Sequence, residues 1–85
     1  MNFFVYLLIS KRKDKHISYV GYTNNVKRRL SLHNSSKGAK FTRGNKWSLI
    51  YKKAYKSKSN ALKEEYKLKK NYVLRNKLKS DFLKK

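Results

Sequence analysis

The sequence predicts a small α+β domain, in which helices flank a three-stranded antiparallel sheet in the chain order β-β-α-β-α-α. An apolar run near the N-terminus has strand length, two later segments are rich in β-branched and aromatic residues, and apolar residues recur at helical spacing in the C-terminal half. The 85 residues suffice for one domain and contain no internal repeat. We therefore expect a single domain over residues 1–85, with a core over about residues 3–71 and a C-terminal helix over about residues 72–83.

The first two strands are expected to form an antiparallel hairpin. Phe3 to Ile9 (FFVYLLI) is continuously apolar, which is typical of a central strand that is buried on both faces. Lys11 to Lys15 (KRKDK) is charged and is expected to form a loose turn. Ile17 to Tyr22 then forms the second strand, with Gly21 as the structural turn residue near its end.

A short basic helix is predicted from about Asn25 to His33, with Asn24 or Asn25 as its N-cap. Arg29 and His33 lie four residues apart in the sequence. Side chains at this spacing lie on the same side of a helix, so these two groups are expected to be neighbours.

The rest of the chain continues the α+β pattern. Asn34 to Lys46 has the composition of a loop, and Trp47 to Ala54 (WSLIYKKA) is predicted as the third strand. A second helix is expected to begin after a cap at Ser57 or Ser59, and a final helix is expected from Tyr72. In that last segment apolar residues recur at every fourth position, which predicts one packed stripe.

Glu65 occupies an unusual place in the second predicted helix. Ala61, Glu65, Leu68 and Tyr72 project to one side of it, so a carboxylate lies within an otherwise apolar stripe. A carboxylate that points toward a core needs a cation, a hydrogen-bonding cluster or a metal as its partner. An ion pair with Lys69, four residues later, is the simpler alternative.

The charge balance indicates a polyanionic partner. The chain has 24 lysine and arginine residues against four acidic residues, a formal net charge of +20. Nucleic acid is the expected partner. No membrane association is expected, because the basic residues are spread along the chain and no apolar run approaches the ~18 residues that span a bilayer. Charge alone would also suit a ribosomal or nucleoid protein.

The absence of cysteine limits the kinds of site that the chain can form. Neither a disulfide framework nor a thiolate metal site is available. A structural zinc site would have to use His16, His33 and the four carboxylates, and we do not expect one. Such a composition fits a reducing compartment, so we expect a cytoplasmic, nucleic-acid-associated protein.

Five short features, taken in chain order, resemble the motifs of the GIY-YIG nucleases. Val5-Tyr6-Leu7 is similar to the first motif through its tyrosine, and Tyr19-Val20-Gly21 is close to the second. Arg29 follows the second tyrosine by ten residues, which is the family's arginine spacing, and His33, four residues later, matches a histidine present in several branches of the family. Glu65, within NALKEEYKLKK, corresponds to the family's metal-binding glutamate. The resemblance covers about Phe3 to Asn71 and is strongest to small standalone members.

The resemblance implies a divalent-metal-dependent endonuclease that hydrolyses DNA. Glu65 would bind one Mg²⁺ or Mn²⁺ ion, which suits a lone carboxylate because these ions keep several of their waters. Arg29 would hold the non-bridging phosphate oxygens. Either Tyr6 or Tyr19 would deprotonate water, and the choice stays open. A phenol with an ordinary pKa of ~10 is a poor base at neutral pH, so it would need help from its surroundings or from His33.

The implied substrate is DNA that is recognised mainly through its phosphates. The residues expected to contact the backbone are all in or after the first helix: Lys27, Arg28, Lys40, Thr42 and Arg43. Sequence specificity should be slight, selectivity for branched, nicked or damaged structures is expected, and DNA repair or recombination is the setting we consider. RNA as the substrate, a targeting protein and the oligomeric state stay open. The alternative is a non-catalytic nucleic-acid-binding module that retains the fold and tolerates the loss of Glu65.

Overall fold

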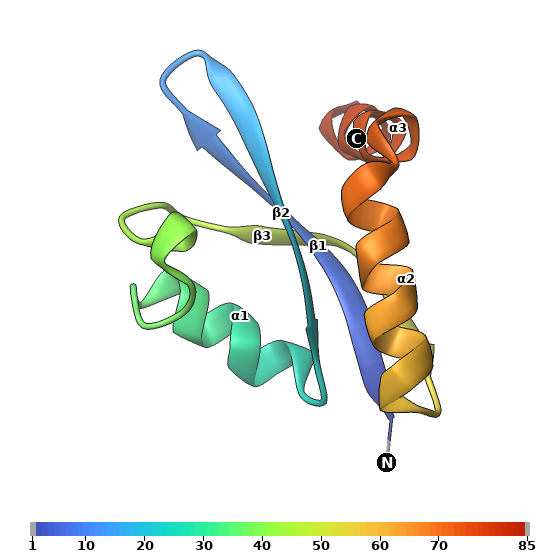
Figure 1. Cartoon of the computed structure of the whole chain (residues 1–85). Helices are drawn as coiled ribbons and strands as arrows, with labels where there is room; N and C mark the ends of the chain where they lie inside the picture. The colour runs from blue at the N-terminus through green and yellow to red at the C-terminus, as the bar shows by residue number, and fades with distance from the viewer. Residues whose placement is uncertain (1, 85) are drawn as a thin grey trace.

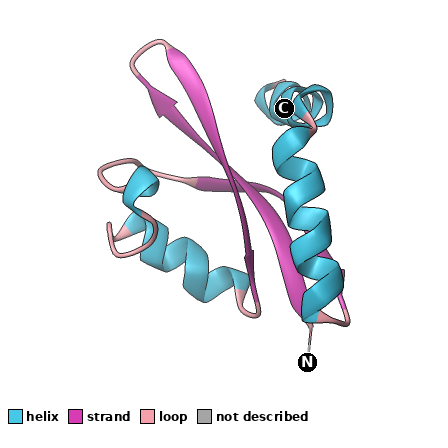
Figure 2. Cartoon of the chain, in the orientation of Figure 1, coloured by secondary structure: helices cyan, strands magenta, loops and turns pink. Residues whose placement is uncertain are grey.

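The computed structural model describes residues 2–84, which form a three-stranded antiparallel sheet with helices on both faces (Figures 1 and 2). The sheet has the strand order β2-β1-β3, so β1 is its central strand. The α+β class and the element order predicted from the sequence are confirmed. The elements, in chain order, are β1 (Phe3–Arg12), β2 (Lys15–Thr23), α1 (Val26–Asn34), the short 3₁₀ helix η1 (Lys40–Thr42), β3 (Ser48–Tyr55), α2 (Lys58–Lys70) and α3 (Tyr72–Leu83).

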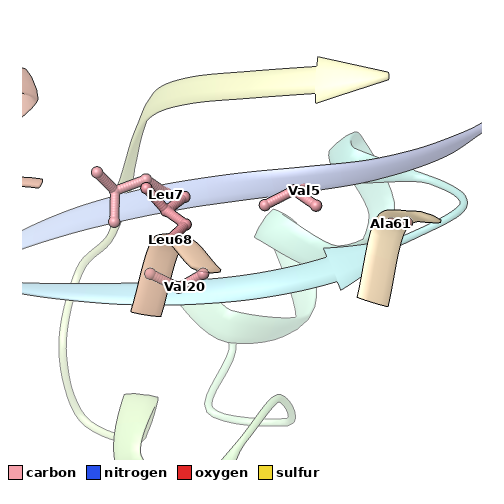
Figure 3. Packing of buried hydrophobic residues seen from close by; sticks show 5 residues of the cluster. All are labelled: Val5, Leu7, Val20, Ala61 and Leu68. Carbon is pink, nitrogen blue, oxygen red and sulfur yellow. The ribbon is translucent and has the colours of Figure 1, made fainter. Parts of the chain in front are cut away.

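The central strand divides the apolar residues between the two faces of the sheet. Side chains alternate along a strand, so odd-numbered β1 residues point to one face and even-numbered residues to the other. Val5 and Leu7 pack with Val20 of β2 and with Ala61 and Leu68 of α2 (Figure 3). This cluster joins the sheet to α2.

The opposite face of the sheet packs against α1. Tyr6 and Leu8 of β1 form a second buried cluster with Trp47, and Leu30 of α1 and Tyr19 of β2 pack against it. In Figure 1 α1 lies on one side of the twisted sheet, whereas α2 and α3 lie on the other. Both tyrosines that the sequence singles out therefore face α1.

The tip of the β1–β2 hairpin is tight, and the expectation of a loose turn is wrong. The two strands pair as far as Arg12 opposite Lys15, which leaves a turn of Lys13 and Asp14. Lys13 adopts a positive φ of 56° there. The charged side chains near the tip are exposed to solvent. The backbone pairing does not depend on apolar side chains, so it continues beyond the end of the apolar pattern.

Gly21 is a strand residue, which corrects its expected role as a turn residue. The second strand continues through it to Thr23, and Gly21 is opposite Tyr6 in the antiparallel register. A Cβ atom at this position would collide with the Tyr6 hydroxyl group and the end of its ring. Glycine is therefore required because the Tyr6 side chain crosses directly over the backbone of β2.

The helix starts are fixed by side-chain caps. Asn25 caps α1, because its Oδ1 atom accepts a hydrogen bond from the Arg28 N–H at 3.1 Å. Ser57 caps α2 by accepting from the Asn60 N–H at 3.1 Å. Asparagine at position 71 ends α2 and also caps α3.

The last helix packs less closely than its apolar spacing suggested. None of the residues from Tyr72 to Leu83 is buried, although Leu78 contacts the cluster beneath α2. None of the helices that the structure describes has the length and the hydropathy that a membrane crossing requires.

Candidate active site

The two motif tyrosines lie side by side on the α1 face of the sheet. Tyr6 comes from β1 and Tyr19 from β2, and their ring centroids are 6.5 Å apart. Tyr6 is only 2% exposed, whereas Tyr19 is partly exposed. The two phenols therefore occupy different environments, one inside the molecule and one at its surface.

A buried chain of hydrogen bonds begins at the Tyr6 hydroxyl. That oxygen is 2.9 Å from His33 Nε2, and His33 Nδ1 is 2.8 Å from Thr42 Oγ1. The Thr42 hydroxyl donates its proton to the Ala39 carbonyl oxygen at 2.8 Å. Thr42 Oγ1 must therefore accept from His33 Nδ1–H, which leaves Nε2 of the neutral ring as the acceptor for the Tyr6 hydroxyl.

The loop after α1 is built around this chain of hydrogen bonds. A Cβ atom at Gly38 would collide with the His33 ring, so glycine lets the loop pass close to it. Trp47 Nε1 donates to the Thr42 carbonyl oxygen at 2.9 Å. Asn34 Nδ2 donates to the Trp47 carbonyl oxygen at 3.0 Å. These contacts fix the loop against Trp47, the residue before β3, and hold Thr42 at the Nδ1 edge of the imidazole ring.

Arg29 projects from α1 toward both tyrosines. Its positive charge lowers the pKa of Tyr6 and of Tyr19, and it also lowers that of His33. The guanidinium also lines a surface hollow of about 300 Å³, together with residues of β1, β2 and the turn before α1: Phe3, Tyr22, Thr23 and Asn24. A guanidinium that lines such an open hollow is suited to hold a phosphate group.

Glu65 acts electrostatically on the same tyrosines from α2, the helix that packs on the other face of the sheet. Its helix, α2, packs against β1 and β2, and β2 is an edge strand. The Glu65 charge raises the pKa of both Tyr6 and Tyr19, so its carboxylate acts on both phenols. The side chain is 18% exposed and pairs with Lys69 at 3.9 Å. Glu65 is thus neither a core residue nor a simple surface ion pair.

Burial dominates the titration of the three ring groups. Burial raises the pKa of Tyr6 to about 12, although Arg29 opposes the shift through polar contact and through its charge. Burial also raises the pKa of Tyr19. Burial lowers the pKa of His33, and the charge of Arg29 lowers it further, which keeps the imidazole neutral. The neutral ring agrees with the direction of hydrogen bonding from Tyr6.

The expected phosphate-contacting residues do not all lie at the surface. Lys27 and Arg28 are exposed on α1, and Lys40 and Arg43 are exposed in and beside η1. Thr42, however, is 0% exposed and bonded to His33, so the expectation that it touches the DNA backbone is corrected. Its hydroxyl is used to fix the imidazole.

Comparison with known proteins assigns the chain to a family. A model of the GIY-YIG catalytic domain matches residues 2–79. The chain belongs to the GIY-YIG family. The GIY-YIG catalytic domain is a nuclease-type domain. In this member of the family, Tyr6 and Tyr19 lie side by side on the sheet. The charges of Arg29 and Glu65 act on both of these phenols.

The relatives of this GIY-YIG protein include proteins of similar size whose names carry no activity. The chain is 43% identical over 65 residues to UPF0213 protein OB0043 of Oceanobacillus iheyensis, which covers 75% of this chain and 74% of that protein. It is also 43% identical over 65 residues to UPF0213 protein SH2523 of Staphylococcus haemolyticus, and this match covers 75% of this chain and 78% of that protein. The solution structure of UPF0213 protein BH0048 from Bacillus halodurans is similar at 40% identity and a TM-score of 0.50, and the match covers 94% of this chain and 84% of that one.

The Glu65 carboxylate of the candidate site has the donor atoms that suit a hard divalent cation. Among residues 2–84, no group of three or more histidine, aspartate or glutamate side chains is placed to hold a metal ion. Glu65 offers one partly exposed carboxylate whose charge acts on the two phenols. Mg²⁺ and Mn²⁺ accept oxygen ligands, and Mg²⁺ in particular is commonly bound through one or two carboxylates with water and substrate phosphate as the other ligands. Glu65 is therefore compatible with such an ion.

Proposed function

We propose that this GIY-YIG protein is a metal-dependent endonuclease that hydrolyses phosphodiester bonds in DNA. The observation that supports the proposal is the convergence of Tyr6, Tyr19, Arg29 and Glu65 from β1, β2, α1 and α2. Arg29 and Glu65 act with opposite signs on the pKa of the same two phenols. A guanidinium, a carboxylate and two phenols that interact electrostatically are the kinds of group that hydrolysis of a phosphodiester requires.

Arg29 is proposed to hold the scissile phosphate. Its guanidinium presents several N–H donors in a plane, which matches two non-bridging phosphate oxygens. The hollow that it lines is open to solvent and close to the turn before α1. Because the Arg29 charge also acts on Tyr19, we propose that a phosphate bound to this guanidinium lies near the partly exposed phenol of Tyr19.

Tyr19 is proposed to be the phenol that faces the attacking water. The Tyr6 hydroxyl is buried and already donates to His33 Nε2, so it is not free to contact water. Tyr19 is partly exposed, and the positive charge of Arg29 lowers its pKa as it lowers that of Tyr6. Tyr6 and His33 are then positioning residues, whose rings pack against the Tyr19 ring.

Glu65 is the residue proposed to bind the metal ion. When bound, a divalent cation neutralises charge that develops on the phosphate and on the leaving oxygen. The Glu65 carboxylate raises the pKa of Tyr19, so neutralisation of that carboxylate charge would make the phenol easier to deprotonate. Lys69 is the present partner of the carboxylate and is exposed enough to move away.

The proposed substrate preference follows from the surface around the site. Lys27 and Arg28 on α1 and Lys40 and Arg43 around η1 are exposed basic residues that can contact phosphates. Phosphate contacts give affinity without reading base sequence. We therefore propose a nuclease with little sequence specificity that selects DNA by its structure, as in repair or recombination.

One experiment tests the proposed hydrolysis. Cleavage of plasmid and branched DNA in Mg²⁺ or Mn²⁺ would be compared between the wild-type protein, Glu65→Gln and Glu64→Gln, with EDTA as a further control. Glu64 is the matched control because it is the neighbouring residue, carries the same charge and pairs with Lys67 at 3.1 Å. The expected result is a loss of at least about 100-fold in Glu65→Gln and in EDTA, with near wild-type cleavage by Glu64→Gln.

The raised pKa values of both tyrosines favour a second candidate function. A phenol whose pKa lies above its ordinary value is almost never ionised at neutral pH, so little phenolate is available to act as a base. A non-catalytic DNA-binding module would not need a general base. In that case no protein would cleave, and Glu65→Gln would bind DNA as well as the wild type or better. Folding and DNA binding are therefore measured for every variant beside cleavage.

A further inference from the structure

Phe41 exposes an aromatic ring beside the candidate site. It lies in η1, and 52% of the residue is accessible although its side chain is large and apolar. Lys40 precedes it and Arg43 follows two residues later, and both are exposed. An isolated exposed apolar side chain needs no explanation by itself, so its contacts decide whether it has a role.

The Phe41 ring is held in a fixed orientation. It is nearly parallel to the Tyr19 ring, at a centroid separation of 6.2 Å and an interplanar angle of 20°. Its centroid is also 6.2 Å from that of Trp47. The next residue, Thr42, is buried and is bonded to both His33 and Trp47. Phe41 therefore projects from a rigid segment, with one side against the site and much of the remainder in solvent.

We propose that Phe41 is a stacking platform for an unpaired nucleobase next to the scissile phosphate. Aromatic side chains bind unpaired bases by stacking, and neighbouring basic residues hold the backbone. Lys40 and Arg43 provide those charges, and the Phe41 ring packs against Tyr19, the phenol that we propose to face the attacking water. Paired bases inside a duplex are already stacked and cannot reach this ring. The position of the base relative to the cut rests on the proposed function.

The proposal names a substrate class. It is DNA with at least one unpaired nucleotide at the cleavage point, such as a gap, a flap or a mismatch. Binding to such DNA in EDTA does not require hydrolysis. The platform can therefore be tested separately from the nuclease activity.

The test measures the affinity of the full chain in EDTA for three probes of one sequence. One probe is a duplex with a single unpaired nucleotide, the second has an abasic residue at that position, and the third is fully paired. The wild-type protein should bind the base-bearing probe about tenfold more tightly than the abasic probe. Phe41→Leu keeps apolar volume but lacks a π face and should lose this preference, whereas Phe41→Trp should keep it.

A matched control and two outcomes decide the test. Tyr72→Leu removes another exposed aromatic ring, one that faces the cationic Arg75 on α3, and should leave the preference unchanged. Equal wild-type affinity for the base-bearing and abasic probes would overturn the proposal. Phe41→Leu binding that falls by the same factor on both probes would also overturn it, because the residue would then support general binding or folding. A base preference without any cleavage would count against the proposed hydrolysis alone.

Discussion

The hydroxyl of Tyr6 lies 2.9 Å from His33 Nε2 and is closed off from solvent, whereas Tyr19, its neighbour on β2, is partly exposed. Thr42 fixes the imidazole from the other side, so the ring is oriented to accept from Tyr6. Two tyrosines that look equivalent in the sequence therefore differ in environment. In the proposed function the first belongs to the buried framework, and the second belongs to the reacting surface.

Removal of the two hydroxyl groups should separate these roles. Tyr6→Phe leaves His33 Nε2 without a donor in a buried place, which should lower the free energy of unfolding by about 1–3 kcal/mol. Tyr19→Phe should change it by less than about 0.5 kcal/mol but should abolish DNA cleavage. Urea denaturation and a cleavage assay measure the two effects. A stable, inactive Tyr6→Phe beside an active Tyr19→Phe would reverse the assignment.

The stability of the protein should fall at acidic pH because His33 is neutral in the folded state. Burial lowers the pKa of His33, so the unfolded chain binds the proton more readily. The free energy of unfolding should therefore decrease as pH falls below ~6.5, the ordinary histidine pKa, and level off below the folded-state pKa. Urea denaturation from pH 7.5 to pH 4.5 measures this change.

Histidine variants assign the pH dependence. His33→Gln should flatten the decrease between about pH 6.5 and the lowered pKa, since the titrating ring is removed. His16→Gln is the matched control because this second histidine is exposed on β2, and it should retain the wild-type slope. If His16→Gln flattens the decrease and His33→Gln does not, the buried neutral imidazole is not its cause.

The sequence was sufficient for those parts of the fold that depend on local pattern. The apolar run at Phe3 predicted the central strand, and polar residues before the first two helices narrowed each cap to two candidates, of which Asn25 and Ser57 are the caps. Glu65 was identified because a carboxylate interrupts an apolar stripe, and its partly buried position agrees with that analysis. Helix periodicity and capping act over a few residues and can be read directly.

The features that the sequence did not predict depend on contacts between distant residues. Gly21 has a strand conformation, and its need for glycine arises only from Tyr6, on the neighbouring strand. Thr42 looked like a surface residue because its neighbours are basic, yet His33 and Trp47 hold it inside. Tertiary hydrogen bonds decide these roles, and no local signal records them.

Substitution by alanine should impair the candidate site at Gly21 and Gly38 but not at Gly44. Gly21→Ala and Gly38→Ala place a Cβ against Tyr6 and His33, which are buried and cannot move freely because each is held by the hydrogen bond between them. Each substitution should lower the free energy of unfolding by about 1–3 kcal/mol and should reduce cleavage. Gly44→Ala meets no atom within 4 Å, but the position has a φ of 78°.

The Gly44 variant is the control for this prediction. It should lower the free energy of unfolding by only about 1–2 kcal/mol through backbone strain and leave cleavage near the wild-type level. Denaturation with urea and initial cleavage rates distinguish the cases. Full activity in both Gly21→Ala and Gly38→Ala would show that the Tyr6–His33 contact has no influence on the site.

DNA affinity should decrease steeply with salt, and the loop beside the site should account for part of the slope. If Lys40 and Arg43 each contact one phosphate, the double change to alanine should lower the slope of log affinity against log salt concentration by about two. The matched pair is Lys77 of α3 and Lys84, the residue that ends this helix. Both are exposed, α3 lies on the other side of the sheet from α1, and removal of the two charges should lower the slope less. Titrations of a labelled duplex at several salt concentrations measure the slopes. Equal changes for the two pairs would mean that DNA binds through diffuse charge rather than at this loop.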